Sequence, residues 1–220
     1  MPKFRMFQVD VFAERLFGGN PAAVVVVDEW PTAQLMQAIA AENNLAETAF
    51  ATGIGSGFGL RWFTPVLEAA FCGHATLAAA HVLATAYCVG GEIAFSTCKV
   101  GILKVHPEDG STRADCSYTL DLPCFAPEPL APIPKSLCAL FPQGWRDVFR
   151  NFENIFVVLG SEAELRAYVP DEICITALCR FGLCITARGV AGVNSISCHA
   201  TSHRERELRK TTLPARRMRR

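Results

Sequence analysis

The chain has 220 residues, and its 21 Lys and Arg residues balance its 21 Asp and Glu residues, so its formal net charge is zero. Half of the residues are hydrophobic and 19% are charged, a composition that excludes an intrinsically disordered chain. The neutral balance gives no general attraction to nucleic acid or to an anionic membrane. Residues 199–220 nevertheless carry eight Lys and Arg against two acidic residues, so the rest of the chain is mildly acidic.

Neither a targeting segment nor a disulfide framework is indicated. The first ten residues mix polar and apolar side chains, unlike a signal peptide, and no apolar stretch is long enough to span a membrane. The ten cysteines occur singly, without a CxxC pair. We interpret them as reduced thiols of a cytoplasmic protein, most of them small core residues. The even spacing of Cys174, Cys179 and Cys184 fits no common zinc pattern.

The first part of the chain predicts strands around one helix. β-Branched and aromatic residues predict four strands, at residues 7–11, 22–27, 48–52 and 60–63. A helix is expected from Trp30 to about Asn44, a tight turn at residues 17–21, and a loop in the glycine-rich run 53–59.

The segment that follows Cys72-Gly73-His74 is apolar on nearly every side. Only His81 and Thr85 interrupt residues 77–88, and a helix with so little polar face must be surrounded by protein. We therefore expect a central helix at residues 75–88, wrapped by a sheet.

The remaining chain predicts a second lobe and a tail. Five further strands are expected, at residues 93–97, 101–105, 117–122, 154–159 and 183–187, with a capped helix at 161–168. The proline-rich run 125–134 indicates a linker. The expected division is a first lobe at 1–124, a partial second lobe at 125–189, and a basic, disordered tail at 190–220, where no period of 2 or 3.6 is visible.

Glu47 is the first candidate for chemistry. It lies between small and apolar residues at a helix-to-strand junction, where partial burial would raise the pKa of its carboxyl toward that of a general acid or base. A solvated Glu at the start of a strand is the alternative, and composition alone favours it.

Gly73 and His74 form the second candidate. A Gly before a buried helix lets a ligand approach the backbone, and the first N–H groups of the helix attract carboxylate or phosphate. The alternative is a core histidine beside a turn glycine. Asn20 lies in a third candidate, Gly18-Gly19-Asn20-Pro21, which has no phosphate-loop spacing and which we interpret first as a turn.

Four motifs, in order and with matching spacing, resemble the phenazine-biosynthesis PhzF-like family. They are Phe17-Gly18-Gly19-Asn20-Pro21-Ala22-Ala23-Val24, Ala41-Glu42-Asn43-Asn44-Leu45-Ala46-Glu47-Thr48-Ala49-Phe50, Leu60-Arg61-Trp62-Phe63-Thr64-Pro65 and Cys72-Gly73-His74-Ala75-Thr76-Leu77-Ala78-Ala79-Ala80. The likeness covers residue 4 to about residue 83 and continues more weakly to Gly189.

The resemblance implies an α+β fold shared with diaminopimelate epimerases, in which each of two lobes is a curled sheet around a central helix. It also implies an isomerase without metal or other cofactor that moves a proton between carbons of a small carboxylate, dihydro-hydroxyanthranilate in the type case. Glu47 matches the family's general acid/base, Gly73 and His74 match its substrate-holding positions, and Asn20 is implied to line the same cleft. The family's tendency to dimerise makes a homodimer the partner to expect; no nucleic acid or membrane partner is implied.

The chain departs from the family's pattern after Gly189. Family members carry a segment of the form Asp-Pro-x-Thr-Gly-Ser-Ala in the second lobe, and residues 190–195 do not match it. This departure resembles a truncated or frameshifted gene product, with an incomplete second lobe. Three interpretations therefore stay open: an isomerase, an inactive family member that binds protein partners through uncovered edges of strands 154–159 and 183–187, and a chain whose second half does not fold stably.

Overall fold

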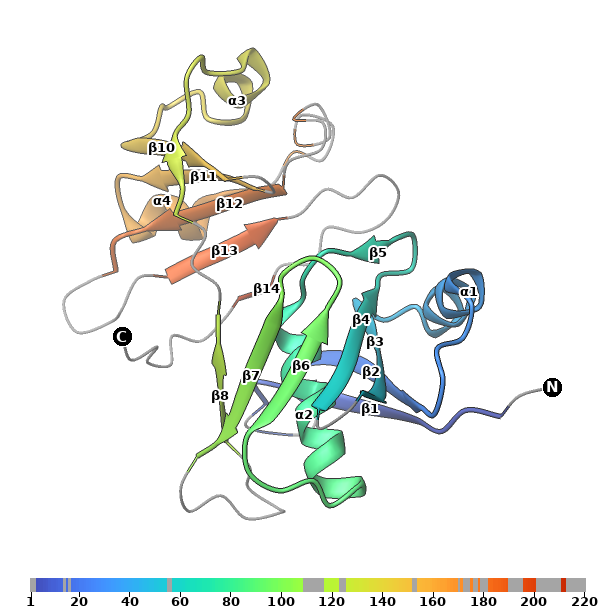
Figure 1. The fold of residues 1–220 in the computed structure, drawn as a ribbon. Helices are drawn as coiled ribbons and strands as arrows, with labels where there is room; N and C mark the ends of the chain where they lie inside the picture. The colour runs from blue at the N-terminus through green and yellow to red at the C-terminus, as the bar shows by residue number, and fades with distance from the viewer. Residues whose placement is uncertain are drawn as a thin grey trace. The chain divides into compact units, whose positions relative to one another are not determined.

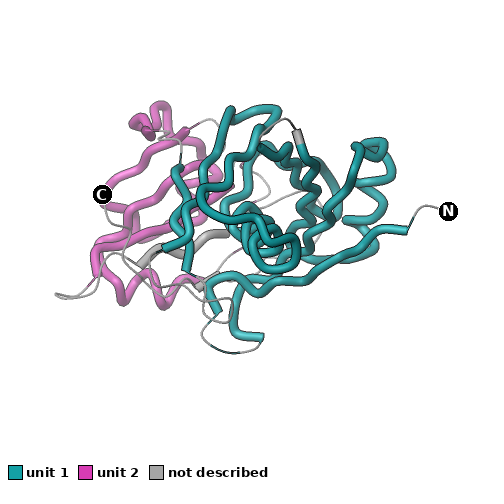
Figure 2. Tube along the Cα trace, turned by 60° about the horizontal axis from the view of Figure 1, so that its bottom comes forward, with its two compact units in different colours: residues 1–123 teal, residues 124–220 magenta. Residues whose placement is uncertain are grey.

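The computed structural model describes two compact units, residues 1–123 and 124–220 (Figure 2). The described residues are 3–13, 15, 17–54, 57–108, 117–122, 126–151, 154–169, 171, 175, 178, 182–189, 196–200 and 211–212. Among them, no helix has the length and apolar character needed to cross a membrane.

The described residues of unit 1 form an eight-stranded sheet and two helices (Figure 1). Its elements in chain order are β1 (Met6–Val11), β2 (Asn20–Val27), α1 (Ala33–Asn43), β3 (Glu47–Ile54), β4 (Gly57–Phe63), β5 (Glu68–Ala69), α2 (Gly73–Ala86), β6 (Ile93–Thr97), β7 (Ile102–Pro107) and β8 (Tyr118–Asp121). The strand order is β1-β2-β3-β4-β6-β7-β8, with β5 beside β4. Two neighbouring pairs are parallel, β2 with β3 and β4 with β6; α1 connects the first pair, and α2 lies between β4 and β6 in the chain.

The alternation of side chains along the strands separates two faces of this sheet. Ala22 and Val24 of β2, with Ala49 of β3, belong to the core cluster that includes α2. The intervening Val25 and Phe50 belong to a second cluster with Met36 and Ala40 of α1. The two helices therefore cover opposite faces.

The helix α2 is enclosed by the sheet. It contacts β1 and β8, the two end strands, as well as β2 and β3 between them, and Figure 1 shows the strands curling around it. Its buried side chains are small in the first two turns, including Ala75, Ala78 and Ala79, which lets the backbone of the helix approach the sheet. The expected central helix is confirmed, and it begins two residues earlier than the sequence predicts, at Gly73.

Unit 2 contains a six-stranded sheet and short helices. Its elements are β9 (Glu128–Pro129), α3 (Lys135–Leu140), β10 (Asp147–Arg150), β11 (Asn154–Leu159), α4 (Glu162–Ala167), β12 (Gly182–Ala187), β13 (Ile196–Ala200) and β14 (Thr211–Thr212). The strand order is β14-β13-β12-β11-β10-β9. Ser161 caps α4 by accepting a hydrogen bond from the backbone N–H of Glu164, as the sequence predicts.

Three local expectations differ from the structure. The run 53–59 contains the ends of the paired strands β3 and β4 instead of a long loop. The helix predicted from Trp30 begins at Ala33, where Thr32 supplies the N-cap. The range 190–220, expected to be a disordered tail, contains the paired strands β13 and β14; its other residues lie outside those described, as do Cys174 and Cys179.

We predict that Ala79→Leu destabilises unit 1 by about 1–3 kcal/mol, because Ala79 is fully buried between α2 and the sheet and a larger side chain must displace packed neighbours. The matched control is Ala86→Leu at the exposed end of the same helix, where the change should stay within about 0.5 kcal/mol. Urea unfolding followed by circular dichroism measures both; equal effects would contradict the enclosure of α2.

Candidate active site

The starts of β2, β3 and α2 form the candidate site. Glu47 is the first residue of β3 and pairs with Ala22 across the parallel ladder. Asn20, Ala22 and Glu47 therefore share the face that carries α2. Since Asn20 is two residues before Ala22 on the same strand, it lies at the same end of the sheet, where it is partly buried.

The first turn of α2 brings His74 to Glu47. The His74 Nε2 atom lies 3.2 Å from Glu47 Oε2, and the two side chains are 12% and 19% exposed. Nε2 is buried but has no hydrogen bond within the described residues. The imidazole is thus close to the carboxylate without the alignment that a hydrogen bond needs.

Cys72 completes a group of three side chains. It occupies the N-cap of α2 and is 7% exposed. Its Sγ atom lies 3.3 Å from His74 Nδ1, on the other side of the ring from the nitrogen that faces Glu47. Thr76 fixes this turn, because its hydroxyl donates a 2.6 Å hydrogen bond to the Cys72 carbonyl oxygen.

Burial shifts the ionisation of all three groups toward their neutral forms. Burial raises the pKa of Glu47 from 4.5 to about 7, and the hydrogen bond with Cys72 offsets part of that rise. Burial lowers the pKa of His74 from 6.5 to about 4. The pKa of the Cys72 thiol is raised well above its ordinary value, mainly by burial and to a smaller extent by the charge of Glu47. Near neutral pH, Glu47 therefore exchanges between its acid and base forms beside a neutral imidazole and a protonated thiol.

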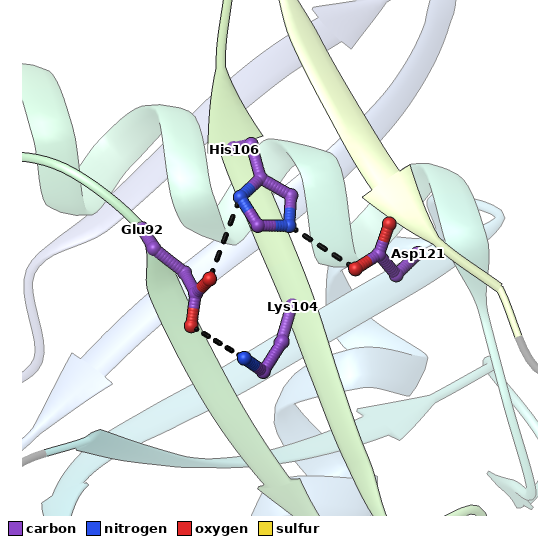
Figure 3. Close-up of polar contacts among 4 residues, drawn as sticks. All are labelled: Glu92, Lys104, His106 and Asp121. Carbon is purple, nitrogen blue, oxygen red and sulfur yellow. Dashed lines mark hydrogen bonds and ion pairs between the residues drawn. The ribbon is translucent and has the colours of Figure 1, made fainter.

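A second histidine with carboxylate neighbours, His106, lies at the surface (Figure 3). Its Nε2 lies 3.1 Å from Asp121 Oδ2 and its Nδ1 lies 3.5 Å from Glu92 Oε2, while Lys104 Nζ lies 2.9 Å from Glu92 Oε1. The four side chains are all more than a third exposed, so water screens these charges. We interpret this group as a surface link between β7 and its neighbours.

The comparisons identify the family of the chain. The family model described as "Phenazine biosynthesis-like protein" (PhzC-PhzF) matches residues 9–200. The chain belongs to this family. An uncharacterized isomerase of Pseudomonas aeruginosa is 41% identical over 184 residues, which are 83% of this chain and 67% of that protein.

Solved structures agree with this membership. A PhzF-family phenazine biosynthesis protein of Enterococcus faecalis is 36% identical with a TM-score of 0.76, over 90% of this chain and 73% of that one. A predicted epimerase of P. aeruginosa has a TM-score of 0.61 at 22% identity, over 83% of this chain and 70% of that one. At that identity the second likeness shows the fold alone. The α+β epimerase-like fold expected from the sequence is confirmed.

Three of the four residues singled out from the sequence, Glu47, Gly73 and His74, lie together in this PhzC-PhzF family member, and Asn20 lies at the same end of the same sheet face. Cys72 belongs to the fourth sequence motif, but the motif alone assigns it no role. A cysteine at a helix N-cap, where Ser, Thr, Asp or Asn is usual, was the available signal. The roles of all these residues stay predictions.

The group also has the donors of a metal site. One ligand atom from each of Glu47, Cys72 and His74 lies within 4.8 Å of the other two, and carboxylate, thiolate and imidazole are the ligand types that zinc accepts. The same atoms of Glu47, Cys72 and His74 also bind and release protons. The sequence predicts a site that works without metal.

We predict opposite pH dependences of stability for two variants of this pair. When the chain folds between pH 4.5 and 6.5, Glu47 gains a proton and His74 loses one. The two changes cancel, so the pair makes the free energy of unfolding almost independent of pH in this range. In His74→Asn only the raised pKa of Glu47 remains. A group with a raised pKa stabilises the folded state at low pH, and this contribution is lost as pH rises. We therefore expect the free energy of unfolding of this variant, relative to wild type, to be about 2 kcal/mol lower at pH 7 than at pH 5. In Glu47→Gln only the lowered pKa of His74 remains, so stability should instead rise by about 2 kcal/mol over that range.

Urea unfolding at pH 5 and pH 7 measures both slopes. His106→Asn is the matched control, because His106 also faces carboxylates but is solvent-exposed, and it should follow the wild type. Slopes of the same sign in the two site variants would contradict the proton exchange on folding.

Proposed function

We propose that this chain is a PhzF-type isomerase that moves a proton between carbons of a small cyclic or amino-acid-like carboxylate, without metal or other cofactor. The observation that carries the proposal is the buried contact of Glu47 with His74 at the first turn of α2. Family membership supports it, since a similar P. aeruginosa protein is named an uncharacterized isomerase. A soluble carboxylate is the expected partner, and a homodimer is the expected assembly.

The first turn of α2 supplies the anion-binding part of this proposal. No side chain caps the helix, and its first turn contains no acidic residue. The N–H groups that begin a helix have no partner within it, and they carry the positive end of the helix dipole. A substrate carboxylate placed at Gly73 and His74 would accept hydrogen bonds from these groups.

Proton transfer would then use Glu47 in both of its forms. The ionised carboxylate removes a proton from a carbon of the substrate that is activated by the neighbouring carbonyl or double bond. The electron pair moves onto the substrate's oxygen, where the neutral His74 imidazole and the helix N–H groups stabilise it. Glu47, now protonated, returns the proton to a different carbon, so the reaction is an isomerisation with no net gain or loss of atoms.

Two features favoured the alternative function, a partner-binding module: uncovered strand edges in the second lobe and the missing second-lobe motif after Gly189. In the structure, β11 is paired with β10 and β12, and β12 is paired with β11 and β13. Both strands expected to expose an edge are therefore interior to their sheet, which removes the first of these features and leaves the second.

We predict that Glu47→Gln lowers the rate of proton exchange into substrate by about 10²–10⁴-fold, because an amide can neither accept nor return the proton. The measurement is NMR of dihydro-hydroxyanthranilate, diaminopimelate and proline, each incubated with the protein in D₂O. Glu92→Gln is the control, since Glu92 also contacts a histidine but lies at the surface. Equal exchange by wild type and Glu47→Gln, or no exchange by wild type with any of the three, would contradict the proposal.

We predict that Gly73→Ala raises KM about tenfold, equivalent to about 1.4 kcal/mol, because the methyl group occupies space that the substrate needs near the backbone. The fold itself leaves room for this methyl group: its nearest neighbours would be Phe71 and Leu120, 3.7 and 3.8 Å away. The melting temperature should therefore hardly change.

Gly19→Ala is the contrasting variant. Its methyl group would lie 2.5 Å from the Val11 carbonyl oxygen, so we expect a loss of stability of about 1–3 kcal/mol. If Gly73→Ala unfolded the chain in the same way, Gly73 would be a structural glycine and this assignment would be wrong.

A further inference from the structure

The three side chains at the first turn of α2 contact one another in every pair. The Glu47 Oε2 atom lies 3.2 Å from His74 Nε2, and the Cys72 Sγ atom lies 3.3 Å from His74 Nδ1. Cys72 and Glu47 are joined by a side-chain hydrogen bond. A carboxyl group, a thiol and an imidazole therefore converge from the start of β3 and the start of α2, and the proposed proton transfer does not use the thiol.

The distances within this group suit a single zinc ion. Zinc binds nitrogen and oxygen ligands at about 2.0–2.2 Å in a tetrahedral arrangement, so two such ligands lie about 3.3 Å apart. The observed distance between Glu47 Oε2 and His74 Nε2 is 3.2 Å. A sulfur ligand would lie about 3.6 Å from each of the others. The three ligand atoms already lie within 4.8 Å of one another, so a side-chain movement of about 1 Å completes the set.

The buried Nε2 atom of His74 is a second observation in favour of a metal. It has no hydrogen-bond partner within the described residues, although buried polar atoms are nearly always paired. Two ligands of one metal ion lie this close without a hydrogen bond between them, because both direct their lone pairs at the metal. The contact of Nε2 with the Glu47 carboxylate has both of these properties.

The charges of the group also suit a divalent cation. The carboxylate of Glu47 and the thiolate of Cys72 together balance the two positive charges of zinc, and His74 binds as a neutral ligand. Binding releases to water the thiol proton, and the carboxyl proton where Glu47 holds one. The complex is then neutral, whereas an uncompensated cation would be opposed by the positive end of the α2 dipole. A thiolate ligand favours zinc over magnesium and calcium, which prefer oxygen ligands.

We propose that Glu47, Cys72 and His74 form an inhibitory zinc site, at which the ion prevents the proton transfer. A bound ion occupies the carboxylate that removes the substrate proton and the imidazole that stabilises the developing charge. The chain thus works without metal and is stopped by zinc. The inhibition rests on the proposed function, whereas the binding of zinc depends only on the folded chain and can be measured without substrate.

The experiment for the metal site uses Co²⁺ as a probe, because cobalt takes the ligands of zinc and a cobalt–thiolate bond adds a charge-transfer absorption in the near ultraviolet. The full chain, kept reduced, is titrated with Co²⁺ and then with Zn²⁺. In the wild type we expect one Co²⁺ per chain with the thiolate absorption, displaced by Zn²⁺ and unaffected by excess Mg²⁺.

The variants identify the ligands. Cys72→Ser should abolish the thiolate absorption and weaken Zn²⁺ binding by at least about 100-fold, since even loss of a residue that only supports a ligand costs about 10–100-fold. Glu47→Gln and His74→Asn should keep the absorption but require more Co²⁺ to reach it. Cys98→Ser, at an exposed cysteine, and His106→Asn, at the surface histidine, are the matched controls and should behave as wild type.

The D₂O exchange assay tests the inhibition. Zn²⁺ should slow exchange by the wild type, and the Zn²⁺ concentration that halves the rate should rise by at least about 100-fold in Cys72→Ser. Zinc that accelerates exchange or leaves it unchanged would overturn the inhibitory role.

A wild type without thiolate absorption, or an absorption that persists in Cys72→Ser, would overturn the metal site. If Cys72→Ser does not fold, weaker cobalt binding by Glu47→Gln and His74→Asn supports the site, and unchanged binding overturns it. If the wild type exchanges none of the substrates, the proposed function and the inhibition fail together, while the cobalt titration still decides whether the three residues bind metal.

Discussion

The enclosure of α2 by a curled sheet is the constraint on which the rest of unit 1 depends. A helix with apolar residues on nearly every side can be stable only where protein surrounds it, and both end strands of the sheet contact it. The helix consequently begins inside the unit, beside the starts of the parallel strands β2 and β3. The backbone N–H groups of the first turn, the carboxyl of Glu47 and the ring of His74 are all brought there by the same packing.

This position explains the chemistry of the site better than the residue types do. His74 and His106 each lie within 3.5 Å of a carboxylate oxygen, yet burial lowers the pKa of His74 to about 4 and raises that of Glu47 to about 7. Around His106 the charges remain in water, where such pairs contribute little. Removal from water, and not the pairing of an acid with a histidine, produces a carboxyl group that can both take and return a proton near neutral pH.

Much of this site could be predicted from one sequence, because its residues lie in short, closely spaced motifs. Glu47, Gly73 and His74 were found in this way, and the apolar segment after His74 predicted the enclosed helix. The prediction of a loop at residues 53–59 was wrong, because its glycines indicate a loop whereas the described backbone there pairs in β3 and β4. The strand β13 was missed although Ile196, Cys198 and Ala200 alternate with polar residues, because so short a run does not stand out beside the basic residues that follow. The strand β14 has only two residues, too few to show a period.

The sequence by itself determined the family, the fold class and the choice of Glu47, Gly73 and His74 as candidate site residues, since each depends on residue types at fixed spacing. Tertiary structure alone decided the burial of Glu47, the approach of His74 Nε2 to its carboxylate, and the contact of the Cys72 thiol with the ring. The first two depend on how the first turn of α2 meets β3, two elements that residues 55–72 separate in the chain. The physical reason is that ionisation and tautomer state follow from the loss of water and from the direction of neighbouring dipoles, which residue order does not contain.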